Sequence, residues 1–475
     1  MRRFITGKDN IDSASFRDRN ARVFYGNTSV YRGLGAEALK EWEALTGTSF
    51  FDQFMKEGSI IGTHRVDPWV PRMDGTVADE WVAVLKHERI PFLSYPYEWT
   101  FGMLKEAAML QLDLIKSALD EGMILKDSSA FNVQWTGASP VFIDIASFEV
   151  LRKGEPWIGY RQFCQMFLYP LMLQSYKGVP FQPWMRGCID GIAPENFSKL
   201  MSRRDLMRPG VFLHVYLQAK AQAKYAATKS DIKKGLSSAG FDKEIIRRNV
   251  MGLRKLVDKL SWNISRSEWS HYSNEHSYTD ADFEVKKSFV RDIAKSKRWR
   301  LVWDLGCNTG TFSRIASENA DYVVAMDADQ LAVEYLYQEL KKEGNKSILP
   351  LVGNIADPSP NLGWRGLERR SLPERRKPEL TLCLALIHHI VISANIPVDE
   401  FIDWLGGLGT SLVIEFVTKE DPMVKKLLLN KIDNYDDYEV DYFEKSLADV
   451  FNVKKREALK SGTRILYFAE AKKRQ

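Results

Sequence analysis

The sequence predicts an α/β protein in two unlike parts: a C-terminal part built on a parallel sheet, and a mixed α+β part before it. From Leu301 onward, apolar runs alternate with glycine turns and helical stretches, which is typical of strand–helix–strand units. Residues 1–190 are instead rich in aromatic residues, glycine and proline. A chain of 475 residues is also long enough for about three domains.

We expect an N-terminal domain over residues 1–195, a helical extension over 196–265 and the sheet domain over 266–475. Within the extension, residues 211–230 are mostly good helix formers. Residues 242–260 place apolar side chains at three-and-four spacing, on one helical face. Residues 262–283 are polar and aromatic, which indicates a linker or a lid between the two parts.

The composition indicates a cytoplasmic protein without a membrane span. None of the four cysteines lies in a CxxC pair, which argues against a zinc knuckle or a disulfide framework and suits a reducing compartment. The N-terminus carries two arginines with no apolar segment behind them, unlike a secretory signal. The longest apolar run, residues 380–392, is too short for a bilayer. A net charge of +5 permits an anionic substrate but argues against a nucleic-acid partner. The oligomeric state stays open.

A candidate nucleoside site begins where the first apolar run of the C-terminal part ends. Asp304 closes that run, Gly306 and Gly310 follow, and residues 311–318 predict a helix. Glycines let the backbone turn tightly and approach a ligand closely. The spacing is neither the GxGxxG of dinucleotide sites nor the GKS or GKT of phosphate-binding loops. We therefore expect a nucleoside ligand without a pyrophosphate.

Further strands extend this pattern. Residues 322–326 end at Asp327, which lies 23 residues after Asp304. In βαβ nucleotide sites an acid about 20 residues on binds the ribose hydroxyls. Three more predicted strands and a closing pair follow at residues 348–352, 380–385, 411–414, 451–453 and 463–468. The polar residues that end the strands should gather at one carboxyl edge of the sheet.

With these motifs in order, residues 301–475 resemble class I S-adenosylmethionine-dependent methyltransferases. The resemblance implies a Rossmann-like seven-stranded sheet and S-adenosyl-L-methionine as cofactor. The sequence lacks the Asp/Asn-Pro-Pro-aromatic signature of enzymes that methylate exocyclic amines of bases. No metal is implied. The implied cofactor-binding residues are Asp304, Gly306, Cys307, Asn308, Gly310, Asp327, Ala328, Asn354, Ile355 and Ala385.

His388 and His389 are the candidate catalytic residues. They follow the fourth predicted strand, beside the expected methyl position, and histidine suits base catalysis near neutral pH. The alternative is that one of them packs under the sheet. Tyr272 and Tyr278 are candidates for closing the site. The basic segment 363–378 either steers an anionic substrate or, as we favour, forms a solvated helix face.

A segment of the N-terminal part resembles the catalytic segment of kinase-like phosphotransferases. A predicted long helix over residues 99–122 precedes Asp127, Asn132, a hairpin and Asp144. The resemblance implies that Asp127 faces an acceptor hydroxyl and that Asn132 and Asp144 hold magnesium. No histidine precedes Asp127, and only 41 residues separate it from Lys86 on the candidate lysine strand. The alternative is a substrate-binding domain in which these are turn residues.

The sequence therefore predicts a multidomain S-adenosylmethionine-dependent methyltransferase acting on a small-molecule or glycan-like acceptor, with the N-terminal part binding the substrate. As a whole the chain is similar to a group of bacterial methyltransferase-like proteins that includes a nodulation-associated one. Two alternatives stay open: a kinase-like phosphotransferase fused to a nucleoside-binding domain, and an RNA methyltransferase.

Overall fold

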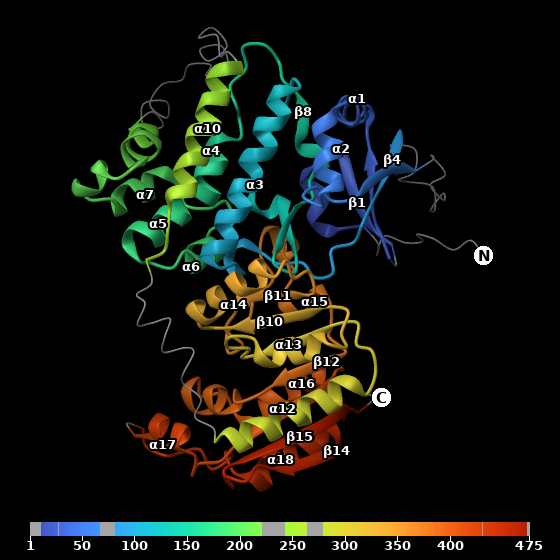
Figure 1. Cartoon of the computed structure of the whole chain (residues 1–475), viewed down its shortest axis with the longest axis vertical. Helices are drawn as coiled ribbons and strands as arrows, with labels where there is room; N and C mark the ends of the chain where they lie inside the picture. The colour runs from blue at the N-terminus through green and yellow to red at the C-terminus, as the bar shows by residue number, and fades with distance from the viewer. Residues whose placement is uncertain are drawn as a thin grey trace.

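The computed structural model describes residues 11–26, 28–66, 81–220, 243–263, 279–429 and 431–472. The N-terminal elements occupy the upper half of Figure 1 and the C-terminal elements the lower half. Besides the elements below there are short 3₁₀ or π helices: η2 (Ser13–Arg17), η3 (Pro96–Glu98), η4 (Ala130–Asn132), η5 (Ile145–Ser147), η6 (Cys164–Leu168), η7 (Arg204–Met207), η8 (Val211–Tyr216), η9 (Trp364–Gly366) and η10 (His389–Ser393).

The N-terminal part begins with a four-stranded antiparallel sheet in the order β1-β2-β4-β3. Two helices, α1 and α2, lie between its second and third strands in the sequence. The bounds are β1 (Ala21–Tyr25), β2 (Val30–Leu34), α1 (Ala36–Thr46), α2 (Ser49–Lys56), β3 (Thr63–Val66) and β4 (Ala83–His87).

The long helix α3 (Phe101–Asp120) confirms the helix predicted over residues 99–122. The Thr100 side chain accepts a hydrogen bond from the Met103 amide and so begins the helix. After α3, β5 (Met123–Leu125) pairs with β8 (Phe148–Val150), and β6 (Val133–Thr136) with β7 (Ser139–Phe142). The predicted hairpin is therefore present.

Helices complete the N-terminal part. Helix α10 (Lys243–Lys259) confirms the predicted amphipathic helix, and its apolar face is buried against α3. Residues 211–216 begin the other predicted helical stretch as a π helix, and residues 221–230 lie outside the described part. The remaining helices are α4 (Tyr160–Phe163), α5 (Tyr169–Lys177), α6 (Gln182–Gly187) and α7 (Pro194–Leu200).

The C-terminal part is a seven-stranded sheet in the order β11-β10-β9-β12-β13-β15-β14. The first five strands in this order are parallel, and β15 runs antiparallel to both β13 and β14. This confirms the predicted sheet, including its closing pair. The strands are β9 (Val302–Leu305), β10 (Val323–Asp327), β11 (Ile348–Val352), β12 (Leu380–Cys383), β13 (Ser411–Val417), β14 (Phe451–Ala458) and β15 (Arg464–Ala471).

Helices accompany the strands of this sheet. Asp329 begins α14 by accepting hydrogen bonds from two backbone amides of its first turn. Helix α12 starts at Asp280, so the end of the predicted linker at 262–283 is helical, while residues 264–278 lie outside the described part. The helices are α12 (Asp280–Lys295), α13 (Thr311–Ser317), α14 (Gln330–Lys342), α15 (Leu372–Arg375), α16 (Val398–Gly407), α17 (Pro422–Leu428) and α18 (Val440–Val450).

The two parts share one hydrophobic core. Trp135 of β6 packs edge-on against Tyr337 of α14, with ring centres 5.7 Å apart. The Gly102 amide of α3 donates to the buried Glu334 carboxylate at 2.9 Å. In Figure 1, α3 runs down toward α14 and β11. Among the described residues, every helix is too short or too polar to cross a bilayer.

One basic segment departs from the expectation of a solvated helix face. Arg375 is buried, and its two terminal nitrogens each lie 2.7 Å from a carboxylate oxygen of the buried Glu98. The solvated-face interpretation of residues 363–378 is therefore wrong for Arg375. A buried guanidinium needs a carboxylate partner, and the partner comes from the other part of the chain, 277 residues away.

Candidate functional site

The loop after β9 has the conformation that its glycines permit. Gly306 and Gly310 adopt φ values of 76° and 84°, and between them Asn308 adopts 48°. The amides of Gly306 and Cys307 both donate to the Met326 carbonyl of β10, at 2.8 and 3.0 Å. The loop is therefore fixed against the neighbouring strand and turns sharply at the carboxyl edge of the sheet.

Asp327 ends β10 beside this loop. Its two carboxylate oxygens accept from the amides of Asn308 at 2.8 Å and Asp329 at 2.9 Å. An ionised carboxylate offers about four acceptor positions, so capacity for two further donors is left. The side chain is only half-buried and can meet a ligand.

Asp304 is placed differently from Asp327. It is buried, and it accepts a hydrogen bond from the Ser313 hydroxyl of α13 at 2.5 Å. Burial raises the pKa of Asp304 to about 6, and Ser313 opposes that shift. Asp304 thus joins the strand to the helix beneath the loop. Ser313 was not among the predicted residues, although it is the third residue of the helix that follows the loop.

The other candidate cofactor residues surround the same edge. Asn354 is exposed, and its side chain accepts from the Ala356 amide, so it closes its own turn. Ala385 has a φ of 51°, a conformation that non-glycine residues rarely adopt. Ala328 is exposed, Ile355 is half-buried against the core, and Cys307 is buried with its thiol pKa raised by burial.

The two histidines after β12 lie in unlike surroundings. His388 is buried, its Nδ1 has no hydrogen-bond partner among the residues that the structure describes, and burial lowers its pKa to about 2. The residue His389 is exposed, but its ring is partly screened from water; this partial burial lowers its pKa, and the charge of Asp327 opposes that shift. His389 therefore lies on the same edge as Asp327, whereas His388 points into the protein.

A buried ion-pair network beneath this edge was not predicted. Lys286 of α12 and Arg464 of β15 both contact the Glu415 carboxylate of β13, at 2.6 and 3.2 Å. Arg464 also pairs with Asp421 at 2.8 Å. Glu415 lies within the otherwise apolar, buried strand β13, and a charged residue in such a strand is the one signal of this network in the sequence. Tyr272 and Tyr278, the candidates for closing the site, lie outside the described residues.

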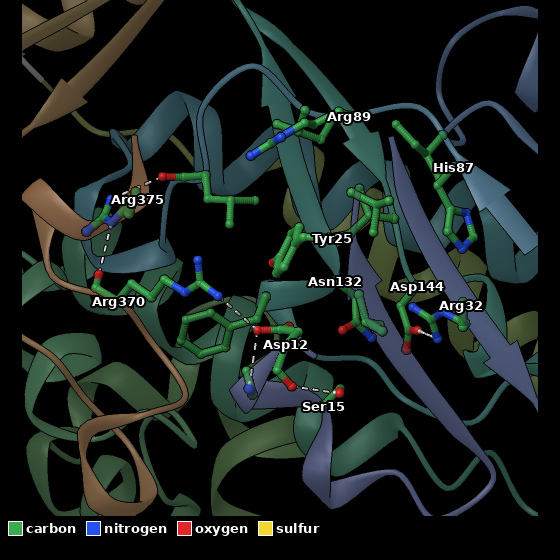
Figure 2. A pocket seen from close by; sticks show the side chains of 18 of the residues that line it. Asp12, Ser15, Tyr25, Arg32, His87, Arg89, Asn132, Asp144, Arg370 and Arg375 are labelled. Carbon is green, nitrogen blue, oxygen red and sulfur yellow. Dashed lines mark hydrogen bonds and ion pairs between the residues drawn. The ribbon is translucent and has the colours of Figure 1, made fainter. Parts of the chain in front are cut away.

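The kinase-like candidates of the N-terminal part do come together. Burial raises the pKa of Asp127, and the charge of Asp144 adds to that shift. Asn132 lies close enough to lower the same pKa, although its Nδ2 makes no hydrogen bond of standard geometry. Asp144, however, forms an ion pair with Arg32 of β2 at 2.7 Å (Figure 2). The carboxylate expected to hold magnesium is thus already paired with a cation.

Comparison with known proteins identifies the family. No family model matches the sequence. Nodulation protein NoeA of Rhizobium meliloti (strain 1021) is 32% identical over 463 residues, which cover 96% of this chain and 95% of NoeA. The chain belongs to the NoeA family.

Solved structures resemble parts of this NoeA-family chain. The N-methyltransferase NodS from Bradyrhizobium japonicum WM9, in complex with S-adenosyl-l-homocysteine, is 10% identical, with 43% of this chain and 97% of NodS covered and a TM-score of 0.31. The bifunctional kinase-methyltransferase WbdD is 18% identical, with 46% of each chain covered and a TM-score of 0.31. The strand order of the C-terminal sheet, not these partial superpositions, carries the assignment of the fold.

Proposed function

We propose that this NoeA-family chain is an S-adenosylmethionine-dependent methyltransferase that acts on a small-molecule or glycan-like acceptor. The observation that carries the proposal is a glycine turn beside a carboxylate that can still accept further hydrogen bonds, at one edge of a parallel sheet. Gly306 and Gly310 form the turn, and Asp327 keeps two acceptor positions open beside it. Ribose hydroxyls are donors that suit such a carboxylate.

This edge of the sheet, formed by Gly306, Gly310 and Asp327, is called the cofactor edge below, and its residues fit the cofactor. Asp327 would accept from the ribose, and the backbone of residues 306–308 would lie under the methionine moiety. Gly306 supports this assignment, because a Cβ there would stand 3.4 Å from Leu386 and fill the gap between the two loops. Asp304 would act from below, by fixing the start of α13 through Ser313. When bound, the cofactor supplies an electrophilic methyl group on a sulfonium.

His389 is the better candidate for the general base. A base works best when its pKa lies near the working pH and it can reach the nucleophile. His389 is exposed on the Asp327 edge, and the carboxylate opposes the lowering of its pKa. His388, with a pKa of about 2 and a buried ring, is a very weak base. We assign His389 to proton removal and His388 to packing.

The N-terminal part serves acceptor binding in this proposal. Its core is continuous with that of the sheet domain, so it can hold an acceptor in a fixed position relative to the cofactor edge. The kinase-like alternative is less favoured because Arg32 neutralises Asp144. The RNA methyltransferase alternative predicts RNA binding that falls steeply with salt.

A labelled-methyl assay tests the proposed function. The full chain would be incubated with S-adenosylmethionine labelled in its methyl group and pools of metabolites and glycans. The proposal predicts label in a low-molecular-weight or glycan product, and less label when Asp327→Ala is used at the same, sub-saturating cofactor concentration. Label that appears only in added RNA would instead support the RNA methyltransferase alternative.

A further inference from the structure

A cavity of about 350 Å³ lies at the junction of the two parts, and it shares no residue with the cofactor edge. Its walls come from η2 and its flanking residues, from β1, β2 and β4, from the segment 88–93, from residues around η4 and β7, and from the segment 369–376 before β12 (Figure 2). The volume is within the range of small-molecule sites. Seven arginines and four carboxylate residues line the cavity.

Two arginines present unused donors here. Arg369 lies with its guanidinium 3.8 Å from the centre of the Phe131 ring, and its buried Nε has no acceptor in the described part of the chain. Burial lowers the pKa of Arg369, as expected for a cation without a carboxylate in direct contact. Arg32 donates from one terminal nitrogen to Asp144, and its buried Nε likewise has no acceptor within the described ranges. A buried donor that makes no hydrogen bond lowers the stability of the folded state, and a bound oxyanion would accept from these donors.

His87 supplies the opposite function, an unused acceptor. It is only 6% exposed, and its Nδ1 lies 2.8 Å from the Thr63 hydroxyl. That hydroxyl donates its one hydrogen to the Ile61 carbonyl at 2.9 Å, so Nδ1 must carry the proton and donate to Thr63. The ring is neutral because burial and Arg32 lower its pKa to about 3. Nε2 is then an acceptor that has no donor among the described residues.

The same cavity is poorly suited to a divalent metal. Asp144 and Asn132 are the neighbouring oxygen ligands that magnesium would need, yet the Arg32 guanidinium lies 2.7 Å from the Asp144 carboxylate. The guanidinium already balances that carboxylate charge. An anionic ligand would therefore meet arginine directly, without a metal between them.

We propose that this cavity binds a phosphate ester that carries free hydroxyl groups, a sugar phosphate or a nucleotide, without a metal. Arg369 and Arg32 donate to the phosphate, and His87 Nε2 accepts from a ligand hydroxyl. Because the walls come from both parts of the chain, bound ligand also ties the N-terminal sheet to segment 369–376. This site is additional to the proposed methyl-transfer edge and independent of it.

Calorimetric titration of the full chain with ribose 5-phosphate and with AMP, in buffer containing EDTA, tests the proposal. We expect saturable binding of at least one of them, displaced by inorganic phosphate. Arg369→Gln should weaken it at least about tenfold, since it removes a charge-assisted hydrogen bond. Arg32→Lys, which keeps a cation beside Asp144 but removes Nε, should weaken it as well. Arg365→Gln is the matched control, because Arg365 is an exposed arginine of the basic segment 363–378 that does not line the cavity.

Three results would overturn the proposal. The first is no saturable binding of inorganic phosphate, ribose 5-phosphate or AMP up to about 10 mM, the limit of a weak specific site. The second is binding that requires magnesium and is lost in Asp144→Asn. The third is binding that Arg369→Gln and Arg32→Lys leave unchanged while both variants unfold at the wild-type temperature. Asp327→Ala should leave phosphate-ester binding intact, so failure here is distinguishable from failure of the proposed methyl transfer.

Discussion

Two acidic clusters in this protein look alike in the sequence and differ in what surrounds their carboxylates. At the cofactor edge, Asp327 accepts only two backbone hydrogen bonds and keeps room for two more donors. At the junction, Asp144 is paired with the Arg32 guanidinium, and Asp127 beside it has a pKa raised by burial. A carboxylate that follows a strand is thus available to a ligand only where no cationic side chain of the protein forms an ion pair with it.

The largest effect that this comparison predicts is on turnover. His389→Ala should lower kcat by about 100- to 10,000-fold if the acceptor is a hydroxyl or an acidic carbon, which is the usual cost of losing a general base. Cofactor affinity should change little. Because the pKa of His389 is lowered, the acid limb of the kcat profile should lie below pH 6.5.

His388→Ala is the paired variant for that experiment. It removes a buried ring whose pKa is about 2, so its loss should lower stability more than kcat. Full turnover in both single variants and in the double variant would mean that the enzyme works by alignment of the substrates alone.

The next effect is on stability, at the junction. Arg375→Met leaves Glu98 buried without its cation, and breaking a buried pair in this way costs about 3–5 kcal/mol. Denaturant unfolding should register that loss. Arg300→Met breaks an exposed pair with Glu379 and should cost less than about 1 kcal/mol. Equal losses in the two variants would mean that the junction pair does not hold the two parts together.

A smaller effect concerns the pH dependence of stability. The pKa of Asp304 is about 6 in the folded chain against an ordinary 3.8, so the folded state binds its proton more readily than the unfolded state. The contribution of Asp304 to stability should therefore rise as the pH falls from about 6 to about 4, by on the order of 1–3 kcal/mol. Asp304→Asn should lack this rise. If the free energy of unfolding changed with pH equally in the variant and the wild type, Asp304 would not have the raised pKa.

The smallest expected effect is none at all. Because Arg32 occupies Asp144, the wild type should show no magnesium-dependent ATP hydrolysis or phosphotransfer above background. Asp127→Ala and Asp144→Ala should disturb folding or acceptor binding and leave cofactor binding unchanged. Magnesium-dependent ATP binding that Asp144→Ala abolishes would restore the phosphotransferase alternative.

Local sequence patterns were enough to predict the helices and strands, but not the ion pairs that connect residues far apart in the sequence. The apolar stripes of α3 and α10 and the strand–turn–helix pattern after Leu301 are properties of adjacent residues, and the structure confirms them. Arg32 meets Asp144 across 112 residues, and Lys286 meets Glu415 across 129. No spacing rule links such residues, because the fold brings them together.

The same limit explains the candidate site residues. Gly306, Gly310 and Asp327 follow from a motif that is continuous in the sequence, and the structure places them at one edge. Which of two adjacent histidines faces that edge depends on how the π turn after β12 is oriented, and no local pattern states this. Arg375 was misjudged for a similar reason: its carboxylate partner belongs to the other part of the chain.

Calorimetric titration of S-adenosylmethionine into the wild type, Asp327→Ala and Asp144→Ala tests the central claim most directly. The account predicts that Asp327→Ala weakens binding by about 1.5–3 kcal/mol, since two ribose hydroxyls lose a charged acceptor. Asp144→Ala should bind as the wild type does. Unchanged affinity in Asp327→Ala, or a loss confined to Asp144→Ala, would contradict the assignment of the cofactor edge.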